Sequence, residues 1–374
     1  MIYLDNAATG GFKINSVIEA LNHAVKYVCA NPGRSGHRLS IAGAKAIFEC
    51  RNVLGELFSC TPEQVIFTKN CTEALNLAIF GLVKKGAHVV TTTFEHNSVL
   101  RALHQLEKNK IITLDIVSPT DSRCICESIE NAVTDKTNMV VMTATSNVTG
   151  QSFNIERIGK FCQKKNLLFV VDGAQAGGHI RLDMKKQNIS ALCLATHKGL
   201  YGVMGSGALL INDNVEISPL FFGGTGSESF NLDQPNSYPE RLEAGTLNLP
   251  AIMALKAGAE YVYKNLGNIS SHLYNASEYL IKELSSIDGV KIYSSPNQSG
   301  IVAFNVKNLP SQFVADLLDS DYDIAVRGGF HCAPLTHKFL KTSDEGAVRA
   351  SLAVQNTSHE ISQFIRAIKD IAKN

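Results

Sequence analysis

Short apolar runs, each followed by polar residues, recur along the first two thirds of the chain. Runs rich in β-branched and aromatic residues are typical of strands buried in a parallel sheet. We expect strands at residues 66–68, 88–93, 111–117, 138–144, 167–171, 191–195 and 207–211. Helical spacing of apolar residues between these runs predicts helices at 16–29, 39–58, 99–106 and 155–165. The alternation predicts an α/β fold with a mostly parallel sheet that helices cover on both faces.

The pattern changes towards the end of the chain. A proline at position 250 begins a long helix, expected at 250–264. Further helices are expected at 270–286 and 311–318, and shorter strands at 290–293, 301–306, 324–326 and 347–352. Residues 2–8 are expected to be extended. We therefore predict a large domain at 15–250 and a smaller α+β domain made of residues 1–14 and 251–374.

Polar side chains gather at the points where the expected strands end. Open α/β sheets bind ligands at the carboxyl ends of their strands. The side chains expected to meet there are those of Thr72, His96, Asn147, Asp172 and Lys198.

Two of these residues indicate a cofactor. Lys198 follows an apolar run, and three of the next seven residues are glycines, so the backbone there can approach a ligand closely. Asp172 follows another apolar run. A lysine that forms a Schiff base with an aldehyde, and an acid that keeps a pyridine nitrogen protonated, are what a pyridoxal phosphate site requires. Either residue alone is better explained as a solvated loop lysine or a helix cap, but the pair with its glycines favours the cofactor.

Other strand ends leave alternatives open. Thr72 stands at a strand-to-helix junction, where helix N–H groups could hold a phosphate; a first-turn helix residue is an equally good interpretation. His96 could stack on a planar cofactor, although a capping or surface histidine is the commoner role. Residues 223–227 are rich in glycine but lack the lysine of a nucleotide-binding loop, so we interpret them as a plain loop.

The C-terminal part holds two further candidates. Cys332 lies in a glycine-bearing segment beside a histidine and five positions after Arg327, a setting that favours a reactive thiol over a packing role. The glycines of residues 327–336 predict a flexible segment. Arg349 interrupts an apolar strand, so it needs an anionic partner. That partner is either a substrate carboxylate, held by the guanidinium fork, or a structural carboxylate.

Composition narrows the class of protein. The 374 residues carry a formal net charge of +1, which gives no reason to expect nucleic acid or an anionic membrane surface as partner. No uninterrupted membrane-spanning run or secretory signal is present in the sequence. Nine cysteines without a Cys-x-x-Cys pair argue against a metal site or disulfides and favour a reducing cytoplasm. Apart from Cys332, most of them are expected to be buried.

Taken together, these segments resemble the cysteine desulfurase and selenocysteine lyase family, within the class V aminotransferase superfamily. The resemblance covers essentially the whole chain. The segments that carry it are residues 3–9, Glu95-His96-Asn97, 146–150, 172–176, His197-Lys198, 241–246, 327–332 and 349–352. It implies the pyridoxal-phosphate-dependent transferase fold of type I. The His331-Cys332 segment with Arg327 points to the desulfurase branch.

The resemblance also implies roles at the cofactor. Lys198 would bind the cofactor covalently and shuttle the Cα proton. Asp172 would pair with the pyridine nitrogen and Gln175 with the ring hydroxyl, while His96 would stack on the ring and act in catalysis. The residues expected to hold the phosphate and complete the cofactor site are Cys71, Thr72, Asn147, His197 and, from the other subunit of a homodimer, Thr246.

The implied substrate is L-cysteine. Asn147 and Arg349 would bind its carboxylate, with Arg327 nearby. Cys332 would attack the substrate sulfur and become a persulfide, releasing alanine, and a sulfur-acceptor protein is a possible partner. The substrate entrance is expected to be lined by Asn31, Arg34 and His37.

The chain departs from the family at four positions. Cys71 stands where a threonine is common, and Phe330 where a histidine is common. Ala195 occupies a position for a small residue that is often serine, and Gly199 looks like an extra residue after the lysine. We predict a cysteine desulfurase, with a selenocysteine lyase, another β-lyase or an aminotransferase as the alternative. A non-catalytic scaffold is disfavoured because the lysine is retained, and a nucleotide-binding enzyme is disfavoured further.

Overall fold

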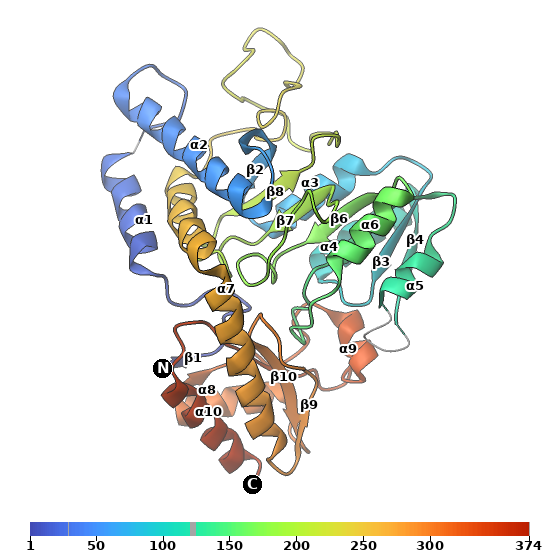
Figure 1. Cartoon of the computed structure of the whole chain (residues 1–374), viewed down its shortest axis with the longest axis vertical. Coiled ribbons are helices and arrows are strands. Elements are labelled where there is room, and N and C mark those ends of the chain that lie inside the picture. The colour runs from blue at the N-terminus through green and yellow to red at the C-terminus, as the bar shows by residue number, and fades with distance from the viewer. Residues whose placement is uncertain (29, 120–124, 374) are drawn as a thin grey trace.

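A seven-stranded sheet is the largest feature of the computed structural model, which describes residues 1–28, 30–119 and 125–373 (Figure 1). The strand order is β2-β8-β7-β6-β5-β3-β4, and only β8 runs against its neighbours. The strands are β2 (Val65–Thr68), β3 (Ala87–Thr92), β4 (Ile112–Val117), β5 (Thr137–Thr143), β6 (Leu168–Asp172), β7 (Ala191–Leu194) and β8 (Gly207–Ile211). The predicted mostly parallel α/β sheet is therefore confirmed.

Helices cover both faces of this sheet. In β7, Leu192 and Leu194 pack into one hydrophobic cluster, while Ala191 and Cys193 pack into another. Alternate residues of a strand point to opposite faces, so β7 is buried on both sides, as its apolar run predicts. The helices in this part are α1 (Asn15–Tyr27), α2 (Arg38–Phe58), α3 (Cys71–Leu82), α4 (Asn97–Lys108), α5 (Ile125–Ala132) and α6 (Ile155–Lys164), with a 3-10 turn, η1 (Pro62–Gln64).

One long helix, α7 (Leu249–Ser285), replaces the two helices predicted at 250–264 and 270–286. Ile269, inside the expected break, is buried, and the Ser270 hydroxyl donates to the backbone carbonyl of His179. These contacts outweigh the weak helix propensity of Gly267. Figure 1 shows α7 running from the helices beside the sheet down to the smaller sheet below.

A three-stranded antiparallel sheet, in the order β12-β10-β9, forms the lower part of Figure 1. The short strand β1 (Ile2–Tyr3) pairs in parallel with β11 (Ile324–Ala325), so the N-terminal segment joins this part. The other elements are β9 (Val290–Ile292), β10 (Ile301–Val306), β12 (Val348–Ser351), α8 (Ser311–Tyr322), α9 (Pro334–Leu340) and α10 (Ser358–Ile371). The sequence patterns did not predict α9 and α10, and the predicted domain bounds stay a prediction.

The cysteines mostly follow expectation. Cys332 is exposed and Cys60 is half-buried, whereas Cys50, Cys71, Cys126, Cys162 and Cys193 are buried, and all seven are free thiols. Cys29 and Cys124 lie outside the described residues. Among the helices of the described ranges, none is both long and apolar enough to cross a membrane.

Candidate active site

The carboxyl ends of the central strands, the N-terminal segment at Ala7 and Ala8, the segment between β11 and α9, and Arg349 of β12 enclose a cavity of about 230 Å³. Most of the residues predicted to act together do line it. They are Cys71, Thr72, His96, Asn147, Asp172, Gln175, His197, Lys198, Arg327 and Arg349. The parallel sheet explains the convergence of the residues at its strand ends, because parallel strands present their carboxyl ends at one edge. Arg327 and Arg349 instead come from the C-terminal part, where they bridge to each other.

Lys198 is held in a tight turn after β7. Its backbone N–H donates to Ala195 at 3.3 Å, and its carbonyl accepts from Tyr201 at 3.0 Å. Burial, and next the positive charge of Arg349, lower the pKa of Lys198, while Asp172 opposes the shift. The lysine is therefore easier to deprotonate than one in water, which suits a nucleophile or a base.

Asp172 is buried at the end of β6, with one carboxylate oxygen already bonded. Its Oδ1 accepts from the Ala174 N–H at 2.9 Å and from the Cys71 thiol at 3.7 Å. Burial raises the pKa of Cys71 well above its usual value, so it stays a thiol and donates. Cys71 lines the cavity with its thiol bonded to Asp172, and its role at the phosphate stays a prediction.

Gln175 and His96 flank the same cavity. The Gln175 amide donates to the carbonyl of Ala7 at 2.9 Å, while its buried Oε1 lacks a hydrogen-bond partner among the described residues. His96 Nδ1 accepts from the Ser98 N–H at 3.0 Å and so caps α4, as the alternative interpretation proposed. Burial lowers the pKa of His96, which favours a neutral ring beside the cavity.

The start of α3 supplies the polar end of the cavity. Asn70 caps this helix by accepting from the Glu73 N–H at 2.9 Å, and Thr72 is exposed in its first turn. Nearby, His197 Nδ1 lies 3.0 Å from the Thr9 hydroxyl. Burial, followed by the charge of Lys198, lowers the pKa of His197 to about 4, so its ring is neutral at pH 7.

Arg349 already has a carboxylate partner within the chain. Its side chain is 1% exposed; Nη2 lies 2.8 Å from Asp5 Oδ1, and Nη1 donates to the Asn147 carbonyl at 2.9 Å. The structural ion pair, one of two alternatives left open by the sequence, is thus present. The Nε of Arg349 is buried without a hydrogen-bond partner among the residues described. One donor of the fork therefore remains free for a ligand.

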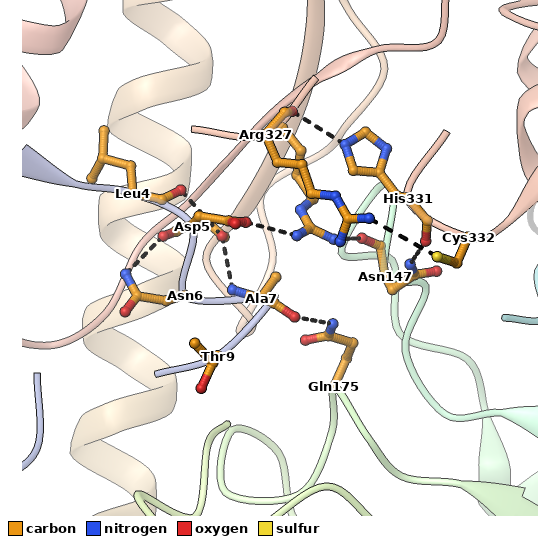
Figure 2. Close-up of polar contacts among 12 residues, drawn as sticks. Leu4, Asp5, Asn6, Ala7, Thr9, Asn147, Gln175, Arg327, His331 and Cys332 are labelled. Carbon is orange, nitrogen blue, oxygen red and sulfur yellow. Dashed lines mark hydrogen bonds and ion pairs between the residues drawn. The ribbon is translucent and has the colours of Figure 1, made fainter. Parts of the chain in front are cut away.

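Cys332 lies at the surface beside the cavity, in a turn with a left-handed backbone: φ is +50° at His331 and +57° at Cys332. Its sulfur is 3.9 Å from Arg327 Nη2, and its carbonyl accepts from the Asn97 N–H at 2.7 Å. Figure 2 shows Arg327, His331, Cys332 and Asn147 gathered on one side of Asp5. The thiol faces a second cavity, of about 440 Å³, which shares Thr72, His96 and Ser98 with the first.

Four predicted residues lie outside both cavities. Asn31, Arg34 and Thr246 line a separate cavity of about 480 Å³, and the His37 side chain caps α2 by accepting from the Ser40 N–H at 3.3 Å. The single chain therefore does not bring them to Lys198. Their roles at the substrate entrance and, for Thr246, in a second subunit stay predictions.

Three residues of the site carry contacts that sequence reasoning did not assign. Asp5 pairs with Arg349, as described above. Glu95 is buried, and burial raises its pKa to about 8, although its Oε1 accepts from Thr92 at 2.6 Å and from the Thr143 N–H at 3.0 Å. Lys13 donates to the His197 carbonyl at 3.1 Å, and burial lowers its pKa to about 8. Glu95 was signalled by its place next to His96; no pattern pointed to Lys13.

Within the described ranges, no group of three or more His, Cys, Asp or Glu side chains is arranged to hold a metal ion.

Comparison with known proteins gives a consistent result. The family model of aminotransferase class-V matches residues 2–364. A probable cysteine desulfurase of Pyrococcus abyssi is 34% identical over 100% of this chain and 95% of the relative. One of Methanothermobacter thermautotrophicus is 31% identical over 99% of this chain and 94% of that protein. The apo structure of a cysteine desulfurase from Thermococcus onnurineus NA1 has a TM-score of 0.93 and 31% identity, covering 100% of this chain and 94% of that one.

Proposed function

The chain belongs to the class-V aminotransferase family and to its cysteine desulfurase group, as the sequence predicted, and we propose that it removes sulfur from L-cysteine and releases L-alanine. The observation that carries the proposal is the nearness of two unlike groups. Lys198, with its lowered pKa, lines the cavity of about 230 Å³, here called the inner cavity. The exposed Cys332 lines the adjoining cavity of about 440 Å³, here called the outer cavity. Thr72, His96 and Ser98 belong to both cavities.

Pyridoxal phosphate is the proposed cofactor, and the residues present fit it. Gln175 Oε1, buried and unpartnered among the described residues, is free to accept from the ring hydroxyl. Asp172, bonded through Oδ1, has its second carboxylate oxygen available for the pyridine nitrogen. Thr72, in the first turn of α3, and His197 would hold the phosphate, where the helix dipole favours an anion. Bound cofactor supplies an electron sink that accepts the electrons of the substrate's Cα–H bond.

Substrate binding follows from the cations around the cavity. Arg349 is fixed by Asp5 and Asn147, and its free Nε is available to the substrate carboxylate. Arg327 adds a second positive charge at the same cavity. Because Asp5 neutralises part of the positive charge, Arg349 can stay buried and positioned before the substrate arrives.

Proton transfer is assigned to Lys198. Its lowered pKa allows the neutral amine to take the Cα proton, and the ammonium then returns a proton to the substrate carbon.

Sulfur transfer is assigned to Cys332. The thiolate attacks the sulfur of the substrate, so an S–S bond forms as the Cβ–S bond breaks. The electron pair of the broken bond stays with the carbon skeleton, which takes up a proton and leaves as alanine. The protein keeps the sulfur as a persulfide on Cys332, and a second thiol must reduce this persulfide to release sulfide. Its exposed position suits transfer to a sulfur-acceptor protein.

A homodimer is also proposed. Phe230 and Leu232 are fully exposed on the loop that projects at the top of Figure 1, and exposed apolar patches mark interaction surfaces. Thr246 lines the cavity beside this loop. We expect sedimentation to give twice the chain mass, and a monomer with full activity would rule out a role for Thr246 in a second site.

The test is product analysis with L-cysteine and a thiol reductant. Purified protein loaded with pyridoxal phosphate is expected to be yellow and to form alanine and sulfide in equal amounts. Cys332→Ser should keep the colour and lose both products. A yellow protein that forms alanine from another amino acid but none from cysteine would refute the assignment.

A further inference from the structure

Two buried histidines lie directly behind the Cys332 turn. The side chains of His331 and His337 are 2% and 0% exposed, and the two rings stack at 5.5 Å with 20° between their planes. His331 Nδ1 and His337 Nε2 are 3.3 Å apart. Neither ring lies among the groups to which a chemical step was assigned above.

The hydrogen-bond partners fix where the protons are. The Arg327 carbonyl can only accept, so His331 Nε2, 3.2 Å away, must carry a hydrogen. A neutral His331 then accepts at Nδ1 from His337 Nε2–H. His337 Nδ1 in turn accepts from the Thr342 hydroxyl at 2.8 Å. With both rings neutral, every member of this row has its partner.

Burial keeps both rings neutral. Burial lowers the pKa of His337 to about 4, although a hydrogen bond to the Phe330 backbone opposes the shift. Burial, and next the charge of Arg349, lower the pKa of His331 well below its usual value, and Arg327 acts in the same sense. Phe330 closes the other side, its ring meeting that of His337 edge-on at 5.6 Å.

The chain of hydrogen bonds from Arg327 through His331 and His337 to Thr342 ties the Cys332 turn to helix α9. His337 lies in α9, and His331 precedes the cysteine. The left-handed backbone at His331 and Cys332 is costly for residues with a side chain and must be held by its surroundings. The Asn147 amide holds this turn from the cavity side by donating to the His331 carbonyl at 2.7 Å. The histidine pair holds it from the interior.

We propose that His337 is a positioning residue for Cys332: through His331 it fixes the turn so that the thiol stands beside Arg327 and faces the outer cavity. The consequence for sulfur transfer rests on the proposed function. The effect on the position of the Cys332 thiol is independent of the proposed function, because it concerns only the distance between the Cys332 sulfur and the Arg327 guanidinium.

The experiment compares His337→Leu with His337→Gln in the protein loaded with pyridoxal phosphate. Glutamine can still donate to His331 but cannot also accept from Thr342 at the same geometry, whereas leucine can do neither. His272→Leu, an exposed histidine on α7, is the matched control. The first readout is the rate at which Cys332 is alkylated by anionic iodoacetate relative to neutral iodoacetamide, since Arg327 favours the anion.

We expect His337→Leu to lower the iodoacetate preference and to lower kcat by about ten- to a hundredfold, with little change in KM, as for a misplaced reacting group. The glutamine variant should stay within about fivefold of the parent, the effect of one lost hydrogen bond. The yellow colour should be unchanged in both. If His337→Leu does not fold, Thr342→Val removes the same hydrogen bond as the glutamine variant and should lower the iodoacetate preference and kcat by about two- to fivefold.

A parent-like alkylation ratio and kcat in His337→Leu, or in Thr342→Val, would overturn the positioning role. If the parent forms no sulfide, the proposed function fails, but the alkylation ratio still decides whether His337 positions the thiol.

Discussion

Replacing Asp5 by asparagine tests the electrostatics of the site most simply. The substitution keeps an oxygen that can accept from Arg349 but removes the negative charge 2.8 Å from the guanidinium. Arg349 is 1% exposed, and Arg327 already acts to lower its pKa. The variant therefore leaves a buried cation beside another cation, with only neutral acceptors.

The expected loss follows from this burial. Removing one partner of a buried ion pair costs about 3–5 kcal/mol, and the lower value applies because Asp5 is 20% exposed. A loss of about 3 kcal/mol in a chain of 374 residues corresponds to a fall of roughly 4 °C in Tm, at about 2.1 cal/mol/K of unfolding entropy per residue. Urea unfolding at low salt measures the free energy directly.

Asp323→Asn is the matched control. Asp323 pairs with the N-terminal amine at 2.5 Å, but the two groups are 68% and 55% exposed. Exposed pairs contribute at most about 1 kcal/mol, so this variant should unfold nearly as the parent does. An Asp5→Asn variant as stable as the parent, or a control that loses as much stability, would contradict a stabilising buried ion pair between Asp5 and Arg349.

Three further changes have defined outcomes. Burial raises the pKa of Glu95 from 4.5 to about 8, so between these pH values the folded state holds a proton that the unfolded state has lost. This difference destabilises the folded protein more as the pH rises. Glu95→Gln removes it and should raise the free energy of unfolding in urea by roughly 3 kcal/mol at pH 7. Burial lowers the pKa of His337 from 6.5 to about 4, so between these pH values the unfolded state binds a proton that the folded state does not. The free energy of unfolding of the parent therefore falls as the pH drops from 6.5 to 4. The fall measured for His337→Gln in urea should be roughly 3 kcal/mol smaller than that of the parent. Arg51 and Glu243 form an ion pair with both side chains 7% exposed, so Arg51→Ala leaves a buried carboxylate without its partner and should lower the free energy of unfolding by about 3–5 kcal/mol. The double variant Arg51→Ala with Glu243→Leu should recover most of that loss in urea unfolding. A double variant as unstable as Arg51→Ala would contradict a buried ion pair.

The sequence predicted the inner cavity well because its residues follow strand ends. Lys198 and Asp172 each come after a buried apolar run, and neighbouring parallel strands must present such residues at one edge. The same local signals located the turns before α3 and α4. Cys71, Gln175 and His197 in the same cavity were assigned by the family resemblance and not by the period of the apolar residues.

Contacts between distant segments were not predictable in the same way. Asp5 meets Arg349 only because β1 pairs with β11 and its following residues run beside β12, and no local pattern announces that pairing. The division of α7 into two helices was wrong because burial of Ile269 outweighs local propensity. Helix α10 was missed although Thr357 and Glu360 form a capping box that the sequence displays.

Persulfide formation on Cys332 is tested most directly by locating the sulfur atom after the reaction. Protein loaded with pyridoxal phosphate is treated with L-cysteine without reductant, and its peptides are analysed by mass spectrometry. We expect one additional sulfur atom on the Cys332 peptide, formed together with alanine, and none in Lys198→Ala. Alanine formation with sulfur on another cysteine, or with none retained on Cys332, would contradict it.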